Sequence, residues 1–498
     1  MSAFARADDG NVGLPERVAS AATAGPAGEL HIHVAMLDFE AVVRDLHSSG
    51  ARFISLFLAG TSRPVLIGLF ALHGDLLVLQ SVPDGGEPIL YGEMGSWWPA
   101  VRWAEMELLE TQADRHTSSA ERRLLTRPNA DLLDRTVHGL DAFTIPYGPV
   151  RSGIFEAIQF QIETGGEDVT RLQTRPFFKR RGIEARFAGL APDVAVHVAE
   201  RVAGIASTAY ACAFCQAVER ALGVDVPPQA ERWRAVFCEL ERMACHLDVI
   251  AKEAETTALY VGQARFQILK ERVQRLRTCL TGSRFGRGVV VPGGVRLPDA
   301  LGIDELLREV NSLERDLEHD ERLFLGTASM TDRLIGGGVL PRQLIEDYGA
   351  VGPLARGSGV STDARHERPY GDYQRLGLRV VVHRDGDAMA RVNVRFGELA
   401  ESLRLLRQAA EQIRREGGGL RVSVPAMGAG TACGWVEAPQ GELVIWVEIT
   451  GGIVRHVHVA SPSFRNWALF DHAFPKDVLT DFAFIEHSFG LTPAGADR

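Results

Sequence analysis

Two groups of cysteine and histidine residues have spacings that could hold a metal ion or a redox pair. Cys212 and Cys215 form a C-x-x-C motif, and Cys238, Cys245 and His246 follow in the next predicted helix. A soft metal needs thiolate or imidazole ligands that converge on one point. Both groups lie in apolar runs of helical period, without further ligands at zinc-site spacing, so we interpret them as buried core residues. The spacing of these residues therefore predicts no metal site.

The composition is that of an ordinary folded protein without a nucleic-acid interface. The chain has 498 residues, 46% of them hydrophobic, and a net charge of -10 from 64 acidic and 54 basic residues without long blocks of one sign. No apolar run approaches the roughly 20 residues that cross a bilayer, so we expect membrane association only through partners. Six cysteines in so long a chain indicate a reducing compartment. Without a recognisable secretion signal, the sequence predicts a cytoplasmic protein.

Two regions of different periodicity must position the functional residues. We expect a flexible tail at 1–30, a small α/β domain at 31–111, a linker at 112–137 and a second domain at 138–498. The first domain should contain a helix at 35–46 and strands at 51–58, 64–71 and 75–81. The second should contain a hairpin at Gly165-Gly166, long helices over 193–280 broken at Pro227-Pro228, and strands at 443–450 and 453–459. The pattern predicts an α+β fold, with a mainly helical bundle and peripheral antiparallel sheets in the second domain.

Several motifs resemble those shared by respiratory complex I and the large subunits of group-4 nickel–iron hydrogenases. They are Arg181-Gly-Ile-Glu184, Glu239-Leu-Glu-Arg242 with His246-Leu247, Leu280-Thr-Gly-Ser-Arg284, and Gly352-Pro-Leu-Ala-Arg356-Gly-Ser358-Gly359 continuing to Asp363 and Arg365. Trp97-Trp98 and the acids after them resemble the end of the 30-kDa-type subunit of complex I. The order is that of the fused large subunit of formate hydrogenlyase, so the resemblance implies the complex I 49-kDa or hydrogenase large-subunit fold. We interpret Arg356, Ser358, Asp363 and Arg365 as a structural hydrogen-bonding loop near a subunit junction.

In the hydrogenases, two pairs of cysteines hold the nickel–iron centre, and the resemblance places other residues at all four positions here. The first pair falls at Ala203 and Ala206, within Arg201-Val-Ala-Gly-Ile-Ala-Ser-Thr-Ala-Tyr210, where Tyr210 stands at a histidine position. The second pair falls at Thr492 and Gly495, and Gln440 stands where hydrogenases carry an arginine. None of these groups offers a thiolate. We therefore expect no metal and no cofactor in this chain, while Tyr210 and Gln440 either line a new pocket or fill the vacated space.

In complex I the same cavity binds a quinone headgroup through a histidine and a tyrosine. The resemblance places Arg151 at the histidine position and Pro192 at the tyrosine position. An arginine can bond a carbonyl but cannot deliver a proton, because its pKa stays above about 12. We interpret Arg151 as a ligand or proton-path residue, since stability alone hardly explains a charge directed into the cavity. Glu156 aligns with an acid that relays protons toward the membrane side, or forms a plain hairpin salt bridge.

The resemblance as a whole implies a non-hydrogenase large subunit of a membrane-anchored, energy-converting complex that couples electron transfer to ion translocation. Its expected partners are an iron–sulfur small subunit, a ferredoxin-like subunit and antiporter-like membrane subunits, at the inner face of the cell membrane. Two alternatives stay open. In one, Arg151, Tyr210 and Gln440 bind a quinone or another small acceptor that the complex reduces, as in NADH-quinone oxidoreductase. In the other, the chain is purely a structural scaffold whose cavity has collapsed.

Overall fold

The protein divides into two compact units. The computed structural model describes residues 16–25, 28–60, 64–82, 94–116, 143–151, 156–297, 302–474 and 477–498. One unit comprises Met1–Leu124 with Asp347–Gly349, and the other comprises Leu125–Glu346 with Ala350–Arg498. Most of the expected linker at 112–137 lies outside the described residues, and its first part, to His116, continues a helix.

The first unit is a five-stranded sheet with helices. Its strands lie in the order β1-β2-β5-β4-β3, and only β2 and β5 pair in parallel. The elements are α1 Glu16–Ala21, β1 Ala22–Ala24, β2 Leu30–His33, α2 Phe39–Ser48, β3 Arg52–Ala59, β4 Val65–Leu72, β5 Asp75–Ser81 and α3 Arg102–His116. The expected helix and three strands are confirmed to within a few residues at each end. Part of the segment expected to be a loose tail instead forms α1 and β1, because β1 pairs with β2.

The second unit combines a bundle of long helices with two three-stranded antiparallel sheets. Its strands are β6 Phe143–Tyr147, β7 Gln159–Thr164, β8 Val169–Arg175, β9 Val290–Val291, β10 Gly294–Val295, β11 Gly430–Ala438, β12 Gly441–Thr450 and β13 Ile453–Ala460. Its helices are α4 Pro192–Ala199, α5 Ser207–Ala221, α6 Pro228–Thr256, α7 Tyr260–Thr281, α8 Ile303–Leu325, α9 Ala328–Leu334, α10 Arg342–Asp347, α11 Gly352–Gly357, α12 Ala364–Glu367, α13 Tyr373–Leu376, α14 Ala388–Glu416, α15 Pro462–Trp467, α16 Phe482–Phe489 and α17 Pro493–Asp497.

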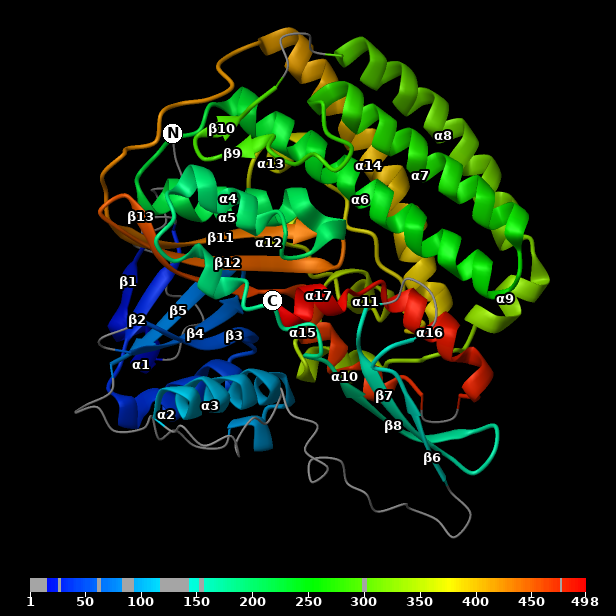
Figure 1. Ribbon diagram of the computed structural model, residues 1–498, viewed down its shortest axis with the longest axis horizontal. Helices are drawn as coiled ribbons and strands as arrows, with labels where there is room; N and C mark the ends of the chain where they lie inside the picture. The colour runs from blue at the N-terminus through cyan, green and yellow to red at the C-terminus, as the bar shows by residue number, and fades with distance from the viewer. Residues whose placement is uncertain are drawn as a thin grey trace. The chain divides into compact units, whose positions relative to one another are not determined.

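Four long helices, α6, α7, α8 and α14, lie side by side and form the bundle (Figure 1). Helix α6 begins at Pro228, whose fixed backbone angle suits the first helical position. Asp387 caps α14 by accepting a hydrogen bond of 2.7 Å from the Ala390 N–H. Gly282 ends α7 in the left-handed conformation, with φ of 72°. Local sequence signals therefore set the ends of the helices that carry much of the candidate site.

The sheet β11–β12–β13 packs beneath helix α5 (Figure 1). A β-carbon at Gly434, in β11, would lie 1.9 Å from the Ala213 carbonyl oxygen of α5, so only glycine allows this close approach. The two-residue turn Pro439-Gln440 joins β11 to β12. The expected hairpin at Gly165-Gly166, the break at Pro227-Pro228 and both C-terminal strands are confirmed. The α+β fold class predicted from the sequence is confirmed as well.

Candidate functional site

Two short segments carry the four positions that the sequence resemblance assigns to metal ligands. Ala203 is extended (φ -137°, ψ 117°) and precedes the turn Gly204–Ala206 at the start of α5. Thr492 is also extended (φ -128°, ψ 123°) and precedes α17, which contains Gly495. Each segment is thus an extended residue followed by a helical turn. This local geometry places residues three apart on the same short turn.

Arg181 holds the two segments together. Its Nη2 donates hydrogen bonds to the carbonyls of Val202, at 2.5 Å, and Ala494, at 3.2 Å. Its Nη1 donates a third to the carbonyl of Arg201 at 3.1 Å. Because the accepting carbonyls belong to both segments, residues almost 300 positions apart in sequence form one site. The Arg181-Gly-Ile-Glu184 motif therefore has a structural role at this site.

Tyr210 fills space beside the second segment. Its side chain is buried, and its hydroxyl lies 3.1 Å from Ser461 Oγ. A β-carbon at Gly495 would lie 3.2 Å from the Tyr210 hydroxyl and 3.0 Å from Thr492 Cγ2. Burial raises the pKa of Tyr210 to about 12, so its hydroxyl stays protonated at neutral pH. Of the two alternatives for Tyr210, the geometry favours filling of the vacated space.

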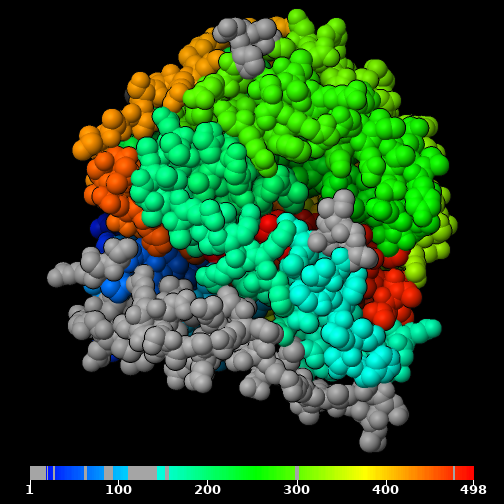
Figure 2. Space-filling model, viewed as in Figure 1, coloured from blue at the N-terminus to red at the C-terminus, as the bar shows by residue number. Residues whose placement is uncertain are grey.

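A cavity of about 740 Å³ adjoins both segments. Gly204 and Ile205 of the first segment line it, and so do Leu491, Thr492 and Pro493 of the second. In Figure 2 the C-terminal segment, in red, is visible in a recess between the cyan hairpin and the green helices. Arg151, Glu156 and Gln440 line the cavity, whereas Ala203, Ala206, Tyr210 and Gly495 do not. The structure thus brings four of the predicted site residues, Arg151, Glu156, Gln440 and Thr492, to one hollow and buries the others outside its lining.

Arg151 is held by a carboxylate in the cavity wall. Its Nη1 donates a hydrogen bond of 2.8 Å to Glu486 Oε2, and the guanidinium lies over the rings of Tyr147 and Phe160 at 5.3 and 5.2 Å from their centres. The side chain of Arg151 is almost fully buried, at 3% exposure. Its charge is therefore compensated, and removal of Arg151 would leave the Glu486 carboxylate without this partner.

Glu156 ties the cavity to the second segment. Its Oε2 accepts hydrogen bonds from Thr492 Oγ1, at 2.6 Å, and from the Ala494 N–H, at 2.8 Å. Lys179 Nζ lies 3.9 Å from Glu156 Oε1. The salt bridge with Lys179 is one of the two roles expected for Glu156, and it is present. Glu156 also lines the cavity, where the other expected role, a proton relay, would place it.

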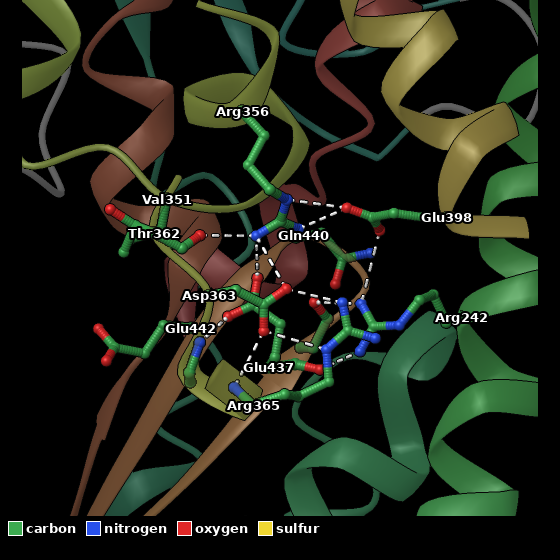
Figure 3. Close-up of polar contacts among 12 residues, drawn as sticks. Arg242, Val351, Arg356, Thr362, Asp363, Arg365, Glu398, Glu437, Gln440 and Glu442 are labelled. Atoms are coloured by element: carbon green, nitrogen blue, oxygen red, sulfur yellow. Dashed lines mark hydrogen bonds and ion pairs between the residues drawn. The ribbon is translucent and has the colours of Figure 1, made fainter. Parts of the chain in front are cut away.

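A buried network of arginines and carboxylates joins helices α6 and α14 to strand β11 (Figure 3). Arg356 Nε donates to Glu398 Oε1, and its Nη1 donates to Glu437 Oε1, both at 2.8 Å. Arg365 pairs with Asp363 at 2.7 Å and with Glu239 at 3.0 Å. These contacts agree with the interpretation of Arg356, Asp363 and Arg365 as a structural hydrogen-bonding loop. The interpretation is wrong for Ser358, whose hydroxyl is buried without a hydrogen-bond partner among the described residues.

His246 connects this network to the cavity wall. Its Nε2 lies 2.7 Å from Glu398 Oε2, and the ring lines the cavity. Burial lowers the pKa of His246 from 6.5 to about 4, against the opposing effect of the Glu398 carboxylate. The imidazole is therefore neutral at neutral pH and donates to Glu398.

The cysteines do not converge on a metal. Cys212, Cys215 and Cys238 are buried free thiols, and Cys238 Sγ donates a hydrogen bond of 3.7 Å to Cys212 Sγ. Cys245 donates to the Ile205 carbonyl at 2.8 Å, and burial raises its pKa. Among the described residues, no group of three or more histidine, cysteine or acidic side chains is arranged to hold a metal ion. The interpretation as buried core residues is confirmed for Cys212, Cys215, Cys238 and His246, whereas Cys245 is only partly buried and lines the cavity.

The four residues at the expected ligand positions do not fit a nickel–iron pair. Two methyl groups, one hydroxyl and one hydrogen atom supply no thiolate, which soft metals require. The hydroxyls of Tyr210 and Ser461 lie 3.2 and 3.3 Å from the point where a side chain at Gly495 would begin. Neither the donor set nor the space around Gly495 suits the metal centre that the resemblance would otherwise imply.

Sequence reasoning missed several titratable residues of the cavity wall, namely Lys252, Lys270, Arg395, Glu486 and His487. Arg391, Arg395 and Glu398 recur at helical spacing along α14, and this buried charged stripe was the available signal. The described part of the chain contains no helix that combines the length and apolar character of a membrane span.

The fold and the paired segments define a large subunit of the complex I and hydrogenase type, and comparisons with known proteins agree. Residues 254–427 match the family described as "Respiratory-chain NADH dehydrogenase, 49 Kd subunit". The carbon monoxide-induced hydrogenase of Rhodospirillum rubrum is 30% identical over 358 residues, which cover 70% of this chain and 97% of that protein. The membrane-bound hydrogenase subunit alpha of Pyrococcus furiosus is 31% identical over 356 residues, covering 68% and 83% of the two chains.

A solved structure shows the same fold in a membrane complex. It is that of the membrane-bound sulfane sulfur reductase, an archaeal respiratory membrane complex, with a TM-score of 0.68 and 25% sequence identity. The match covers 72% of this chain and 99% of the other. This chain belongs to the family of the 49 Kd subunit of respiratory-chain NADH dehydrogenase and the large subunits of membrane-bound hydrogenases. Its relatives include subunits of membrane-bound complexes.

Proposed function

We propose that this chain is a non-hydrogenase large subunit of a membrane-anchored complex, related to complex I and formate hydrogenlyase, that couples electron transfer to ion translocation. The proposal rests on family membership combined with ligand positions that carry no sulfur. These positions are Ala203, Ala206, Thr492 and Gly495. Without thiolates, the chain cannot bind nickel and bridge it to iron as the hydrogenase reaction requires.

The proposed assembly supplies the redox and membrane parts that this chain lacks. We propose an iron–sulfur small subunit and a ferredoxin-like subunit as electron carriers, and antiporter-like subunits in the membrane. The chain itself would sit on the cytoplasmic face of the membrane, held by these partners. Support comes from the relatives that are parts of membrane-bound complexes.

The metal content of the complex tests the proposal. The tagged chain is purified with its native partners, and nickel, iron and zinc are measured per chain by elemental analysis. We expect iron from the partner clusters and no stoichiometric nickel, together with no hydrogen-dependent reduction of a dye. One nickel per chain, or hydrogen oxidation above background, would overturn the proposal.

A second candidate function is reduction of a small acceptor in the cavity. The cavity of about 740 Å³ beside both segments supports this candidate over the collapsed scaffold. Arg151 and Gln440 would contact the acceptor, which is a quinone or another small molecule. Glu156 would carry protons, because it faces the cavity and bonds to Thr492.

Turnover of the purified complex with ubiquinone-1 tests this second candidate. Arg151→Ala should abolish acceptor-dependent turnover, whereas Arg171→Ala, which removes an arginine paired with Glu163 outside the cavity lining, should not. The double variant Arg151→Ala/Glu486→Gln removes both charges of the pair and controls for an unpaired carboxylate. Undiminished turnover in this double variant would contradict a role of Arg151 in acceptor binding.

A further inference from the structure

Arg395 is a buried cation with unused hydrogen-bond donors in the cavity wall. It lies on α14, is 2% exposed and lines the cavity. Its Nη2 donates to the carbonyls of Ser488 and Phe489, both at 3.0 Å. Its Nε and Nη1 are buried without a hydrogen-bond partner. A buried polar group without a hydrogen-bond partner is costly, so an acceptor placed at this guanidinium would stabilise it.

The described lining of the cavity carries more cations than carboxylates. Six cations line it: Arg151, Lys179, Lys252, Lys270, Arg277 and Arg395. Three carboxylates, Glu156, Asp248 and Glu486, line it as well. Every lining cation except Arg395 lies within ion-pair distance of a carboxylate, counted over the described residues. The described lining therefore carries an excess of positive charge, and Arg395, on which Glu398 and Glu253 act only from beyond ion-pair distance, is the cation without a direct carboxylate partner.

Arg395 stays charged under physiological conditions. Burial lowers its pKa to about 10, which leaves the guanidinium protonated at neutral pH. The lining histidines do not add charge, because the pKa values of His246 and His487 are lowered to about 4, chiefly by burial. A ligand that completes the site must therefore bring the negative charge.

An apolar surface adjoins this cation. At Gly490, an added β-carbon would lie 2.3 Å from Arg395 Nη2 and 3.1 Å from Val249 Cγ2, so the guanidinium and the Val249 side chain meet at this glycine. Gly490 has φ of 64°, and its lack of a side chain leaves room for the guanidinium. Val249, Ile205 and Leu491 line the same cavity. A cation beside an apolar wall suits a small organic anion better than a strongly hydrated inorganic one.

We propose that the cavity binds a small organic carboxylate, whose oxygens pair with the guanidinium of Arg395 while its carbon body packs on Val249. Charge-assisted hydrogen bonds of this kind are among the strong ones in proteins. Binding requires no electron transfer and no metal, so it goes beyond the function proposed above. If the redox function proposed above were wrong, the proposal of carboxylate binding would still stand.

Isothermal titration calorimetry on the full-length chain tests the proposal, with sodium propionate as the probe at constant ionic strength. Propionate should bind, and propan-1-ol, which has the same carbon body without the charge, should not. Inorganic phosphate should bind more weakly than propionate. Equal or tighter binding of phosphate, binding of propan-1-ol, or no binding of propionate would each overturn the proposal.

Two matched arginine variants locate the binding. Arg391 lies one helical turn before Arg395, is equally buried and is absent from the cavity lining. Arg395→Gln should weaken propionate binding by about tenfold or more, because one charge-assisted hydrogen bond is worth roughly 1.5–3 kcal/mol. Arg391→Gln should leave the affinity within about twofold of the original, since it changes a comparable buried arginine outside the cavity wall. Equal weakening in both variants would overturn the assignment to Arg395.

A third variant keeps the test valid if a buried arginine proves necessary for folding. Val249→Phe enlarges the apolar wall and leaves Arg395 in place. It should abolish propionate binding while the far-ultraviolet circular dichroism of the chain stays unchanged. Unchanged propionate binding in Val249→Phe would contradict the proposed position of the carbon body.

Discussion

The hydroxyl of Thr492 donates a hydrogen bond of 2.6 Å to Glu156, which lies 336 positions earlier in the chain. Thr492 occupies one of the positions that the resemblance assigns to a metal-binding cysteine. A hydroxyl donates to a carboxylate readily, whereas a metal-bound thiolate has no proton to donate. In this protein the segment is therefore tied to a carboxylate by direct hydrogen bonds.

The first prediction concerns that carboxylate. Glu156→Ala removes the acceptor of two hydrogen bonds, from Thr492 Oγ1 and the Ala494 N–H, and leaves both donors in a largely buried place. We expect the free energy of unfolding to fall by about 1–3 kcal/mol, measured by urea denaturation. Glu156→Gln keeps one oxygen acceptor and should cost less. An equal cost in both variants would show that the charge opposite Lys179, and not the hydrogen bonds, carries the stability.

The second prediction concerns the packing of Tyr210 against Gly495. Gly495→Ala should lower the free energy of unfolding, because its β-carbon would lie only 3.2 Å from the Tyr210 hydroxyl. In a Tyr210→Phe background the hydroxyl is absent, and the cost of the alanine should be smaller. The measurement is a double-mutant cycle by thermal or urea unfolding. Strict additivity of the two changes would contradict this direct contact.

The third prediction concerns acid stability. Burial lowers the pKa of His246 and of His487 from 6.5 to about 4 in the folded protein. As the pH falls through this window, the unfolded chain takes up protons that the folded chain excludes, so stability falls with pH by at most about 1.4 kcal/mol per pH unit for each histidine. Above the window neither histidine contributes.

His487→Gln should flatten this acid loss, and unfolding at about pH 5 and about pH 7 measures it. Asp497 acts in the opposite sense, because burial raises its pKa from 3.8 to about 6 and its contribution to stability is lost as the pH rises through that range. Asp497→Asn removes this opposing effect and should steepen the acid loss. An unchanged slope in His487→Gln would show that His487 titrates normally in the folded chain.

The fourth prediction concerns the buried charge network. Arg356 is fully buried and pairs with Glu398 and Glu437 at 2.7 and 2.8 Å. Arg356→Met would leave both carboxylates without this cation and should cost about 3–5 kcal/mol of unfolding free energy. The exposed pair Arg342–Glu346, also 2.8 Å apart, is the control, and Arg342→Met should cost about 0.5 kcal/mol or less. Similar losses of unfolding free energy in the two variants would show that the buried network stabilises the fold no more than an exposed ion pair does.

Local patterns predicted the elements of the fold well. The helix break at Pro227-Pro228 follows from the backbone of proline, and the hairpin after Thr164 follows from the paired glycines. Alternating apolar residues predicted β12 and β13 to within two residues. Pairing of β1 with β2 was not predicted, because a three-residue strand depends on its neighbour and not on its own sequence.

The candidate site was predicted only in part. The resemblance selected Arg151, Glu156 and Gln440, and all three line the cavity. It did not reveal that Arg151 is paired with Glu486, or that Tyr210 lies outside the cavity lining. Arg395 was missed, because charged residues in a helix are usually solvent-exposed and the sequence does not show that this one is buried by packing.

The sequence by itself determined which chemical groups are available. No cysteine, and therefore no thiolate, stands at the four expected ligand positions. Only the tertiary structure decided which charges are matched, because pairing depends on distances between segments hundreds of residues apart. Glu156 meets Thr492, Arg151 meets Glu486, and Arg395 meets no carboxylate at ion-pair distance within the described chain. The physical reason is that a buried charge is stabilised over only a few ångströms, so its environment is set by packing and not by order along the chain.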